Sequence, residues 1–370
     1  MISRPVHGGN LAWAAQLVGC SPDQILDFSA SISPLGPPAS LLDAIQANLS
    51  RLVAYPDPSY QSLCEQIGLY HQISPDWILP GNGAAELLTW AGRDFSSLSG
   101  CYTLVPGFRD YSRALTSYRV KRQGISLLTD QTWHLDLQEL ANVVLESSQP
   151  DWGLLLNNPH NPTGALFKAN TVERLLDRLG LIVIDEAFMD FVPPEQQQSL
   201  IHQVPQCPNL VILRSLTKFY SIPGLRIGYA IAHPDRIRRW QQWRDPWSVN
   251  TLAAAAAIAA LQDTTFAQHT WAWLAAARAQ LFTAISQLPG FTPLPSQANF
   301  LLVQYTGSVT ALQETLLRQH HIYIRDCLSF PELGDRYFRI AVRTEAENRQ
   351  LVRVLEAEGA EGAGEAEGAL

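Results

Sequence analysis

The middle of the chain alternates short apolar segments with segments of helical periodicity. In residues 171–180, TVERLLDRLG, apolar side chains recur at the spacing of one helix face. The strand-like apolar segments are residues 101–106, 152–156, 181–188, 209–216 and 227–232. Strands that alternate with helices predict an α/β fold with a mainly parallel sheet and crossover helices.

Both ends of the chain differ from this middle part. The first segment is rich in Ser, Pro and Gly, as in DFSASISPLGPP, which favours an arm wrapped over another part of the molecule. An Ala-rich helix is expected from Thr251, and the strand-like FLLVQY, IYIRDC and RYFRIAV that follow predict a smaller α+β domain. The last residues repeat Glu, Ala and Gly without apolar periodicity. The predicted parts are an arm at 1–45 that belongs to the small domain and covers the active site, a large domain at 46–250, the small domain at 251–356 and a disordered tail at 357–370.

Composition and charge narrow the class of ligand. Of the 370 residues, 46% are hydrophobic and 16% are charged, so the chain can bury a large core. The formal net charge of −8 offers no basic excess for nucleic acid or an anionic membrane surface, and a small-molecule substrate is expected instead. Neither a signal peptide nor an uninterrupted apolar stretch of transmembrane length occurs. The cysteines lie far apart without CxxC pairing, which favours neither disulfides nor zinc and indicates a cytoplasmic protein.

Three polar residues follow successive strand-like segments. Asn161 lies in NNPHNPTG, Asp185 in LIVIDEAF, and Lys218 in SLTKFYSIPGLRIG, each at the predicted end of a strand. Taken singly, each has an ordinary explanation: a helix-initiating turn, a helix cap or surface pair, and a surface lysine. A carboxylate at the end of a buried strand is costly without a positive partner, however, and ligands of open α/β sheets bind at the carboxyl ends of strands. The three residues together therefore predict a site at this edge of the sheet.

The segment GNGAAELLTW, which begins at Gly81, predicts a phosphate cradle. It partly matches a dinucleotide-binding fingerprint, but Glu86 stands where the third glycine of GxGxxG is required, so a Rossmann NAD site is not expected. As a glycine turn that opens a helix, it offers the backbone N–H groups of Gly83, Ala84 and Ala85 to an anion at the positive helix end. The motifs GxxxxGK(S/T), GxSxG and HExxH are absent, which removes the simplest nucleotide, serine-hydrolase and zinc-protease interpretations.

Motifs spread along the chain resemble those of fold-type I pyridoxal-phosphate enzymes, which have the aspartate aminotransferase fold. They are HGGN, DFSASISPLG, YPDPSY, DEAFMDF, RSLTKFYSIPGLRIGY and PWSVNTLA, and the resemblance extends from HGGN to RYFRIAVRT. Within these enzymes the chain is similar to the branch of histidinol-phosphate aminotransferases and L-threonine-O-3-phosphate decarboxylases, and it looks more like the decarboxylases of cobalamin synthesis. The resemblance implies a large domain with a mainly parallel sheet, a smaller α+β domain, and pyridoxal 5′-phosphate as cofactor.

The resemblance implies cofactor contacts residue by residue. Lys218 matches the lysine that holds the cofactor as a Schiff base, and Asp185 matches the carboxylate that pairs with its pyridine nitrogen and makes the ring an electron sink. Asn161 matches the partner of the phenolic oxygen and is also an expected substrate contact. Tyr55 matches a tyrosine that reaches across an interface toward the neighbouring subunit's cofactor phosphate, so a homodimer is implied. The other implied contacts are Ser215, Arg226 and the backbone of Gly83, Ala84 and Ala85 in the phosphate cup, with Phe108 stacked on the ring.

Two arginines are candidates for the anionic groups of the substrate. Arg325 in IYIRDC and Arg339 in RYFRIAV have the planar fork that binds carboxylate or phosphate, although each could instead be a surface charge on an edge strand. Which of them binds the carboxylate and which the phosphate stays open. His7 and Gly8 match an arm that closes over the substrate. Ser31 corresponds to a position where related decarboxylases often have asparagine, so its substrate contact would be made by a shorter hydroxyl, directly or through water.

The resemblance implies decarboxylation of L-threonine O-3-phosphate to (R)-1-aminopropan-2-yl phosphate and carbon dioxide. Phe188 of DEAF stands where aminotransferases of this branch commonly have tyrosine, and the decarboxylases share this phenylalanine. The alternative is a histidinol-phosphate-type aminotransferase. A third interpretation, a catalytically silent ligand-sensing domain, is weakened because no helix-turn-helix module is attached and the catalytic set is complete.

Overall fold

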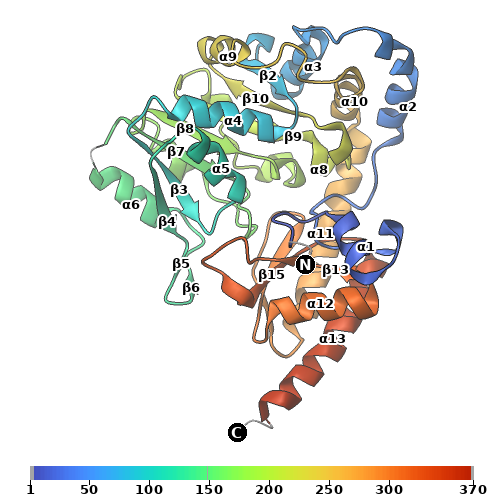
Figure 1. The fold of residues 1–370 in the computed structure, drawn as a ribbon. Helices are drawn as coiled ribbons and strands as arrows, with labels where there is room; N and C mark the ends of the chain where they lie inside the picture. The colour runs from blue at the N-terminus through green and yellow to red at the C-terminus, as the bar shows by residue number, and fades with distance from the viewer. Residues whose placement is uncertain (1–3, 148, 368–370) are drawn as a thin grey trace. The chain divides into compact units, whose positions relative to one another are not determined.

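The computed structural model describes residues 4–147 and 149–367 (Figure 1). The chain forms two compact units. The sheet unit comprises Gly36–Asn161 and Ala165–His269, and the terminal unit comprises Met1–Leu35, Pro162–Gly164 and Thr270–Leu370. These boundaries differ from the predicted ones, because α10 (Thr251–Gln262), expected to open the small domain, packs against α2 (Ala39–Asn48) and α3 (Gln61–His71) of the sheet unit.

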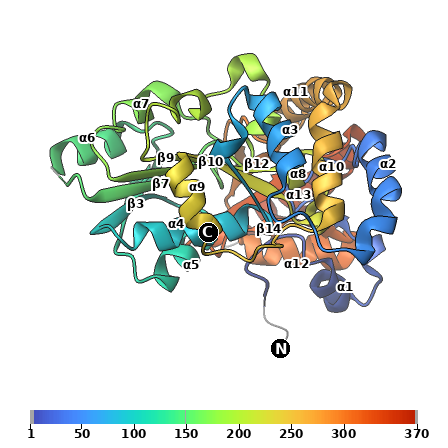
Figure 2. The same ribbon diagram turned by 90° about the horizontal axis from the view of Figure 1, so that it is seen from above.

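The sheet unit is built on a mainly parallel sheet with the strand order β2-β10-β9-β8-β7-β3-β4. Among the described strands of this sheet, β10 runs opposite to the others, so its pairings with β2 and β9 are antiparallel and the remaining pairings are parallel. The strands are β2 (Ile78–Gly81), β3 (Gly100–Val105), β4 (Arg122–Ser126), β7 (Trp152–Asn157), β8 (Leu181–Asp185), β9 (Leu210–Ser215) and β10 (Gly228–Ala232). The strand that follows β3 in the chain is β4, which lies beside β3 at one edge of the sheet. The strands that follow β7, namely β8 and β9, lie on the other side, toward the opposite edge. Right-handed crossovers therefore put α5 (Arg109–Ser117) and α7 (Ala169–Glu173) on opposite faces (Figure 2), and the carboxyl edge beside this switch is where ligands of such sheets bind.

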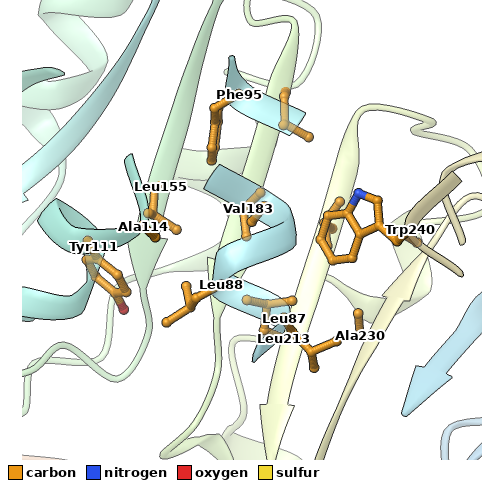
Figure 3. Packing of buried hydrophobic residues seen from close by; sticks show 14 of the residues in the cluster. Leu87, Leu88, Phe95, Tyr111, Ala114, Leu155, Val183, Leu213, Ala230 and Trp240 are labelled. Atoms are coloured by element: carbon orange, nitrogen blue, oxygen red, sulfur yellow. The ribbon is translucent and has the colours of Figure 1, made fainter. Parts of the chain in front are cut away.

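One face of the sheet is covered by α4 (Ala84–Phe95), α5 and α9 (Pro234–Gln241), which share an apolar core with it (Figure 3). Leu87, Leu88 and Phe95 come from one face of α4 and pack with Val183 and Leu213 of the sheet. All five side chains are at most 1% exposed. Burial of each contributes about 1.5–3 kcal/mol to folding, so α4 is firmly held against the sheet.

The terminal unit contains an antiparallel sheet with the order β11-β12-β15-β14 and a parallel pair of β1 with β13. Its strands are β1 (Leu26–Asp27), β11 (Phe291–Pro293), β12 (Phe300–Tyr305), β13 (Ile322–Tyr323), β14 (Arg325–Asp326) and β15 (Tyr337–Ala341), and its helices include α1 (Leu11–Val18), α12 (Val309–His320) and α13 (Glu345–Glu367). Phe28 attaches the N-terminal arm to these strands: its N–H donates to the Tyr323 carbonyl, and its carbonyl accepts from the Ala341 N–H, both at 2.8 Å.

The remaining elements complete the connections between these strands. They are α6 (Gln138–Ser147), α8 (Leu216–Phe219), α11 (Thr264–Ser286) and the hairpin of β5 (Leu128–Thr129) with β6 (Thr132–Trp133). Within the segment 357–370, for which disorder is predicted, α13 extends to Glu367. Residues 368–370 of that segment lie outside the described residues. Over the ranges that the structure describes, no helix has the length and apolar character needed to cross a membrane.

Candidate active site

The carboxyl ends of β7, β8 and β9 lie side by side. Asn157 pairs with Asp185, and Asp185 pairs with Leu213, so the three strands end at nearly the same level. Asp185 is the last residue of β8, as predicted, whereas Asn161 and Lys218 lie beyond the strand ends, in the loop after β7 and in α8 after β9. That loop and that helix both start from the same edge, so the three predicted residues belong to one edge of the sheet.

Asp185 is buried and bound on both carboxylate oxygens. The Tyr111 hydroxyl donates to its Oδ2 at 2.9 Å, and the Ala187 N–H donates to its Oδ1 at 3.0 Å. Burial raises the pKa of Asp185, while the positive charge of Lys218 and these two hydrogen bonds oppose the rise. The ring of Tyr111 meets the predicted stacking residue Phe108 edge-on, with centroids 5.5 Å apart. Asp185 is thus an oriented carboxylate in surroundings where a cationic partner is strongly favoured.

Lys218 extends from α8 over an aromatic ring. Its Nζ lies 5.1 Å from the centroid of Phe188 and 3.4 Å from the Ser215 hydroxyl. The Ser215 hydroxyl is also 2.9 Å from the hydroxyl of Thr217, a residue that the sequence did not single out. Phe188 therefore presents an apolar ring to the lysine.

An anion cradle lies at the N-terminus of α4, where Gly83 is the N-cap residue with φ 74°. A Cβ built on Gly83 would stand 2.4 Å from Arg226 Nη2, so a side chain at this position would displace the guanidinium. Gly228 of β10 pairs with both Gly81 and Ser215, and a Cβ there would stand 2.9 Å from the Ala84 nitrogen. Two glycines thus bring a helix N-terminus, a guanidinium and hydroxyls together, the donors that bind a phosphate group.

A buried network of ion pairs, which the sequence did not predict, joins the end of β9 to the residues that follow β8. Arg214, beside Ser215, reaches Glu186 Oε2 with its Nε at 2.8 Å and Asp190 Oδ1 with its Nη1 at 2.5 Å. Burial alone would lower the pKa of Arg214, but the two carboxylates outweigh burial and raise it, so the guanidinium stays charged. Because Glu186 directly follows Asp185, the network joins the ends of β8 and β9 that carry the candidate residues.

Tyr55 lies on the surface of the sheet unit. Its side chain is 80% exposed and stacks on Trp247, with ring centroids 4.6 Å apart. Other large apolar side chains of the same region are also exposed, namely Leu42, Leu49, Leu52, Val53 and Leu69. Exposed apolar side chains in such number are typical of a surface that another protein chain covers.

In the terminal unit, Arg325 and Arg339 stand directly opposite each other on β14 and β15. Directly opposed cations on one sheet face repel each other unless an anion joins them. Arg325 is 5% exposed and donates to the Val6 carbonyl and the Ser329 hydroxyl. Burial, and to a lesser degree Arg325, lowers the pKa of Arg339 to about 10. β15 lies between β12 and β14, so the edge-strand explanation does not hold for Arg339.

The HGGN segment packs against the residues that follow β1. A Cβ on Gly8 would stand 2.2 Å from the Ser29 carbonyl oxygen, and the Gly9 N–H donates to the Ser29 hydroxyl at 2.8 Å. His7 is exposed beside this contact. The Ser31 hydroxyl is buried and has no hydrogen-bond partner in the described residues. A buried hydroxyl without a partner is what a ligand contact requires of the free protein.

Comparisons with known proteins agree with this arrangement. The sequence profile of the family described as aminotransferase class I and II matches residues 23–355. The threonine-phosphate decarboxylase of Salmonella typhimurium is 40% identical over 94% of this chain and 95% of its own length. Histidinol-phosphate aminotransferase 2 of Nitrosospira multiformis is 31% identical over 94% of this chain and 87% of its own length. The predicted resemblance to this branch is confirmed.

Solved structures show the same fold. The L-threonine-O-3-phosphate decarboxylase of Porphyromonas gingivalis has a TM-score of 0.79 at 25% identity and covers 90% of this chain and 99% of its own. The histidinol-phosphate aminotransferase of Clostridium acetobutylicum has a TM-score of 0.82 at 27% identity and covers 91% of this chain and 100% of its own. The predicted fold class is confirmed by these matches.

Proposed function

The chain belongs to the aminotransferase class I and II family, and from this premise we propose that it is a pyridoxal-phosphate-dependent decarboxylase of L-threonine O-3-phosphate. The products are (R)-1-aminopropan-2-yl phosphate and carbon dioxide, which places the enzyme in cobalamin biosynthesis. The observation that carries the proposal is the similarity, along nearly the whole chain, to the Salmonella typhimurium decarboxylase. Phe188 beside Lys218 supports it, because the aminotransferases of the branch commonly have a tyrosine at this position.

The sheet unit fits the cofactor. The α4 N-terminus, Ser215 and Arg226 would hold the phosphate, since they present backbone and side-chain donors around a space that glycines keep clear. Lys218 would hold the cofactor covalently through its amine, and Asp185 would pair with the pyridine nitrogen. Phe108 would stack on the ring. Asn161, which is buried, would bond the phenolic oxygen.

When bound, pyridoxal phosphate supplies an electron sink for the electron pair left at the substrate Cα as carbon dioxide departs. Asp185 stabilises that sink by its negative charge, and the Tyr111 hydroxyl holds the carboxylate in one orientation. The Lys218 amine returns a proton to Cα, and the adjacent Phe188 ring keeps its surroundings apolar.

The arginines decide which Cα bond breaks. The bond that overlaps the cofactor's π system breaks most easily, so the residues that bind the carboxylate and phosphate of the substrate select the reaction. Arg325, which lies 3.5 Å from an oxygen of the Asp326 carboxylate, and Arg339 offer two guanidinium groups for the two anionic groups. The Ser31 hydroxyl supplies a further donor, and His7 and Gly8 belong to the arm that covers the substrate.

The functional form is a homodimer in the cytoplasm. The surface around Tyr55 and Trp247 provides the apolar side chains that a dimer would cover. In the dimer, Tyr55 reaches the cofactor phosphate of the neighbouring subunit.

The experiment that tests the reaction offers two substrate pairs to the holoenzyme. L-threonine O-3-phosphate without any keto acid is expected to yield carbon dioxide and aminopropanol phosphate. Histidinol phosphate with 2-oxoglutarate is expected to yield no glutamate. Glutamate formation without release of carbon dioxide would overturn the decarboxylase proposal in favour of a histidinol-phosphate aminotransferase.

A further inference from the structure

A second polar depression lies at the other end of the strands of the sheet unit. It is lined by the C-terminal end of α4, by α9 and by the start of β8, and its volume is about 410 Å³. Leu181, the first residue of β8, lines it, whereas Asp185 at the end of β8 belongs to the candidate active site. The depression is therefore separate from Asp185 and the other candidate cofactor residues at the carboxyl edge of this sheet. The lining residues that matter are Arg93, Asp94, Leu98, Arg236, Arg239 and Trp243.

The depression has an excess of positive charge, because its three arginines share a single carboxylate. Asp94 is 6% exposed, and both of its oxygens are occupied. Arg239 Nη2 donates to Oδ1 at 2.8 Å, while Arg236 Nη1 and the Trp240 indole N–H both reach Oδ2. Asp94 is therefore already paired with two of the three guanidinium groups. An excess of two positive charges remains in a chain whose net charge is −8.

The third guanidinium, that of Arg93, has no ion pair or hydrogen bond among the described residues. It lies over the Trp243 ring at 4.3 Å from the centroid, and Arg239 lies 5.9 Å from the same centroid. Stacking on an aromatic face orders a guanidinium without using its N–H donors. Burial lowers the pKa of Arg236 to about 10, and the neighbouring Arg239 adds to this effect. The side chains are thus held close together although their charges repel one another.

We propose that this depression binds a small phosphorylated molecule, at a site separate from the active site and independent of the proposed reaction. A phosphate dianion matches the excess charge, and guanidinium forks match its oxygens. The volume lies in the range of small-molecule pockets, about 300–1,000 Å³, and exceeds what bare phosphate needs. Trp243 and Leu98 offer an apolar wall to the organic part of the ligand.

Calorimetric titration of the holoenzyme tests this site with three probes: inorganic phosphate, AMP and adenosine. Phosphate and AMP are expected to bind, AMP more tightly, and adenosine is expected not to bind. The double variant Arg93→Ala/Arg239→Ala is expected to bind AMP at least about tenfold more weakly, because each removed guanidinium takes away a charged hydrogen-bond donor. Arg238→Ala is the matched control, since Arg238 is an exposed neighbour on α9 that does not line the depression. Its affinity for AMP is expected to equal that of the wild type.

A second control separates this site from the residues proposed to bind the substrate. Arg325→Ala is expected to leave AMP binding unchanged. The proposal is overturned if the double variant binds AMP as the wild type does, or if Arg325→Ala alone abolishes the binding. Decarboxylation by the double variant without AMP is expected to match the wild type, which shows that it is folded. If the double variant does not fold, Arg93→Ala decides the question, because within residues 4–147 and 149–367 this side chain contacts the Trp243 ring but takes part in no ion pair.

Discussion

Asp185 occupies surroundings that would keep it neutral without positive partners. Burial raises the pKa of its carboxyl group, and the opposing influences are the charge of Lys218 and the hydrogen bonds from Tyr111 and Ala187. In the proposed site, Tyr111 would therefore be a positioning residue that acts on the cofactor through Asp185. Its ring also supports Phe108.

Replacing Tyr111 with Phe tests this role. The change removes the hydrogen bond to Asp185 but keeps the ring that meets Phe108. We expect kcat for decarboxylation to fall about 10- to 100-fold, because a hydrogen bond to a charged group contributes about 1.5–3 kcal/mol, while KM changes little. Steady-state kinetics of the variant measure both. Tyr102→Phe, at another buried tyrosine, is the control, and equal kcat values for the two variants would exclude the role of Tyr111.

Lys218 is the residue on which the cofactor assignment depends. We expect Lys218→Ala to lose the visible absorption of the covalently held cofactor and the adduct trapped by borohydride, and to lose turnover by several orders of magnitude, because no other group supplies the amine. Absorption spectra and peptide mapping after reduction measure the linkage. Lys168→Ala, at an exposed lysine, is the control. A trapped adduct on a different lysine would show the assignment to be wrong.

The sequence identifies candidate site residues that stand at or just after the ends of predicted strands. It does not identify residues whose importance comes from a contact with a residue far away in the chain. Asp185 could be singled out because a carboxylate at the end of a buried apolar segment is costly unless a positively charged group pairs with it. Tyr111 lies 74 residues away from Asp185 in the chain, and the sequence around either residue gives no sign that the two side chains are in contact. The link from Arg214 to Glu186 and Asp190 was missed for the same cause. One signal was present for Tyr111: it follows Phe108 by three residues, which is one helical turn.

At the scale of elements, the N-terminus of α4 depends on the glycine that precedes it. Gly83 has a positive φ, and because it has no Cβ the Arg226 guanidinium can lie close to its Cα. The cradle therefore requires glycine at this position for two independent reasons, the backbone conformation and the close guanidinium.

The two reasons can be separated by a pair of substitutions. Gly83→Ala and Gly36→Ala both place a side chain on a backbone with φ 74°, but a Cβ on Gly36 meets nothing within 4 Å. Gly36→Ala is expected to lose about 1–2 kcal/mol of stability from its positive φ. Gly83→Ala is expected to lose about 1–3 kcal/mol, because φ 74° with ψ 163° is a conformation that essentially only glycine adopts. Only Gly83→Ala is expected to weaken cofactor binding, by at least about tenfold, because Arg226 must move. Thermal unfolding measures the first effect and cofactor titration the second; equal cofactor affinity in both variants would contradict the cradle.

Element types were easier to predict than element limits. The parallel strands follow from apolar segments that alternate with helices, and the structure has a strand in each of them. The antiparallel direction of β10 could not be predicted, because apolar composition does not record strand direction. The unit to which α10 belongs is also decided by packing, because the sequence of an Ala-rich helix does not indicate which other helices it contacts.

For the whole molecule, the apolar surface around Tyr55 and Val53 supports the proposed homodimer. Val53 is 95% exposed, and Leu145 on α6, at the other end of the sheet unit (Figure 1), is 42% exposed. We expect Val53→Asp to weaken dimerisation at least about tenfold, because a charge placed in a covered apolar surface loses its hydration. Sedimentation at several protein concentrations measures the association. Leu145→Asp is expected to leave it unchanged, and the same association in both variants would place the interface elsewhere.

The division of the chain at Asn161 and Gly164 has a consequence for how such a protein can be recombined. Pro162–Gly164 belong to the terminal unit although the residues on both sides belong to the sheet unit, and α11 begins in one unit and ends in the other. Neither unit corresponds to one continuous stretch of gene. A chimera with a relative must therefore exchange the two stretches of the sheet unit together, or the three stretches of the terminal unit together, to keep that unit whole. A single crossover point within 36–269 would join halves of different parentage inside the sheet unit itself.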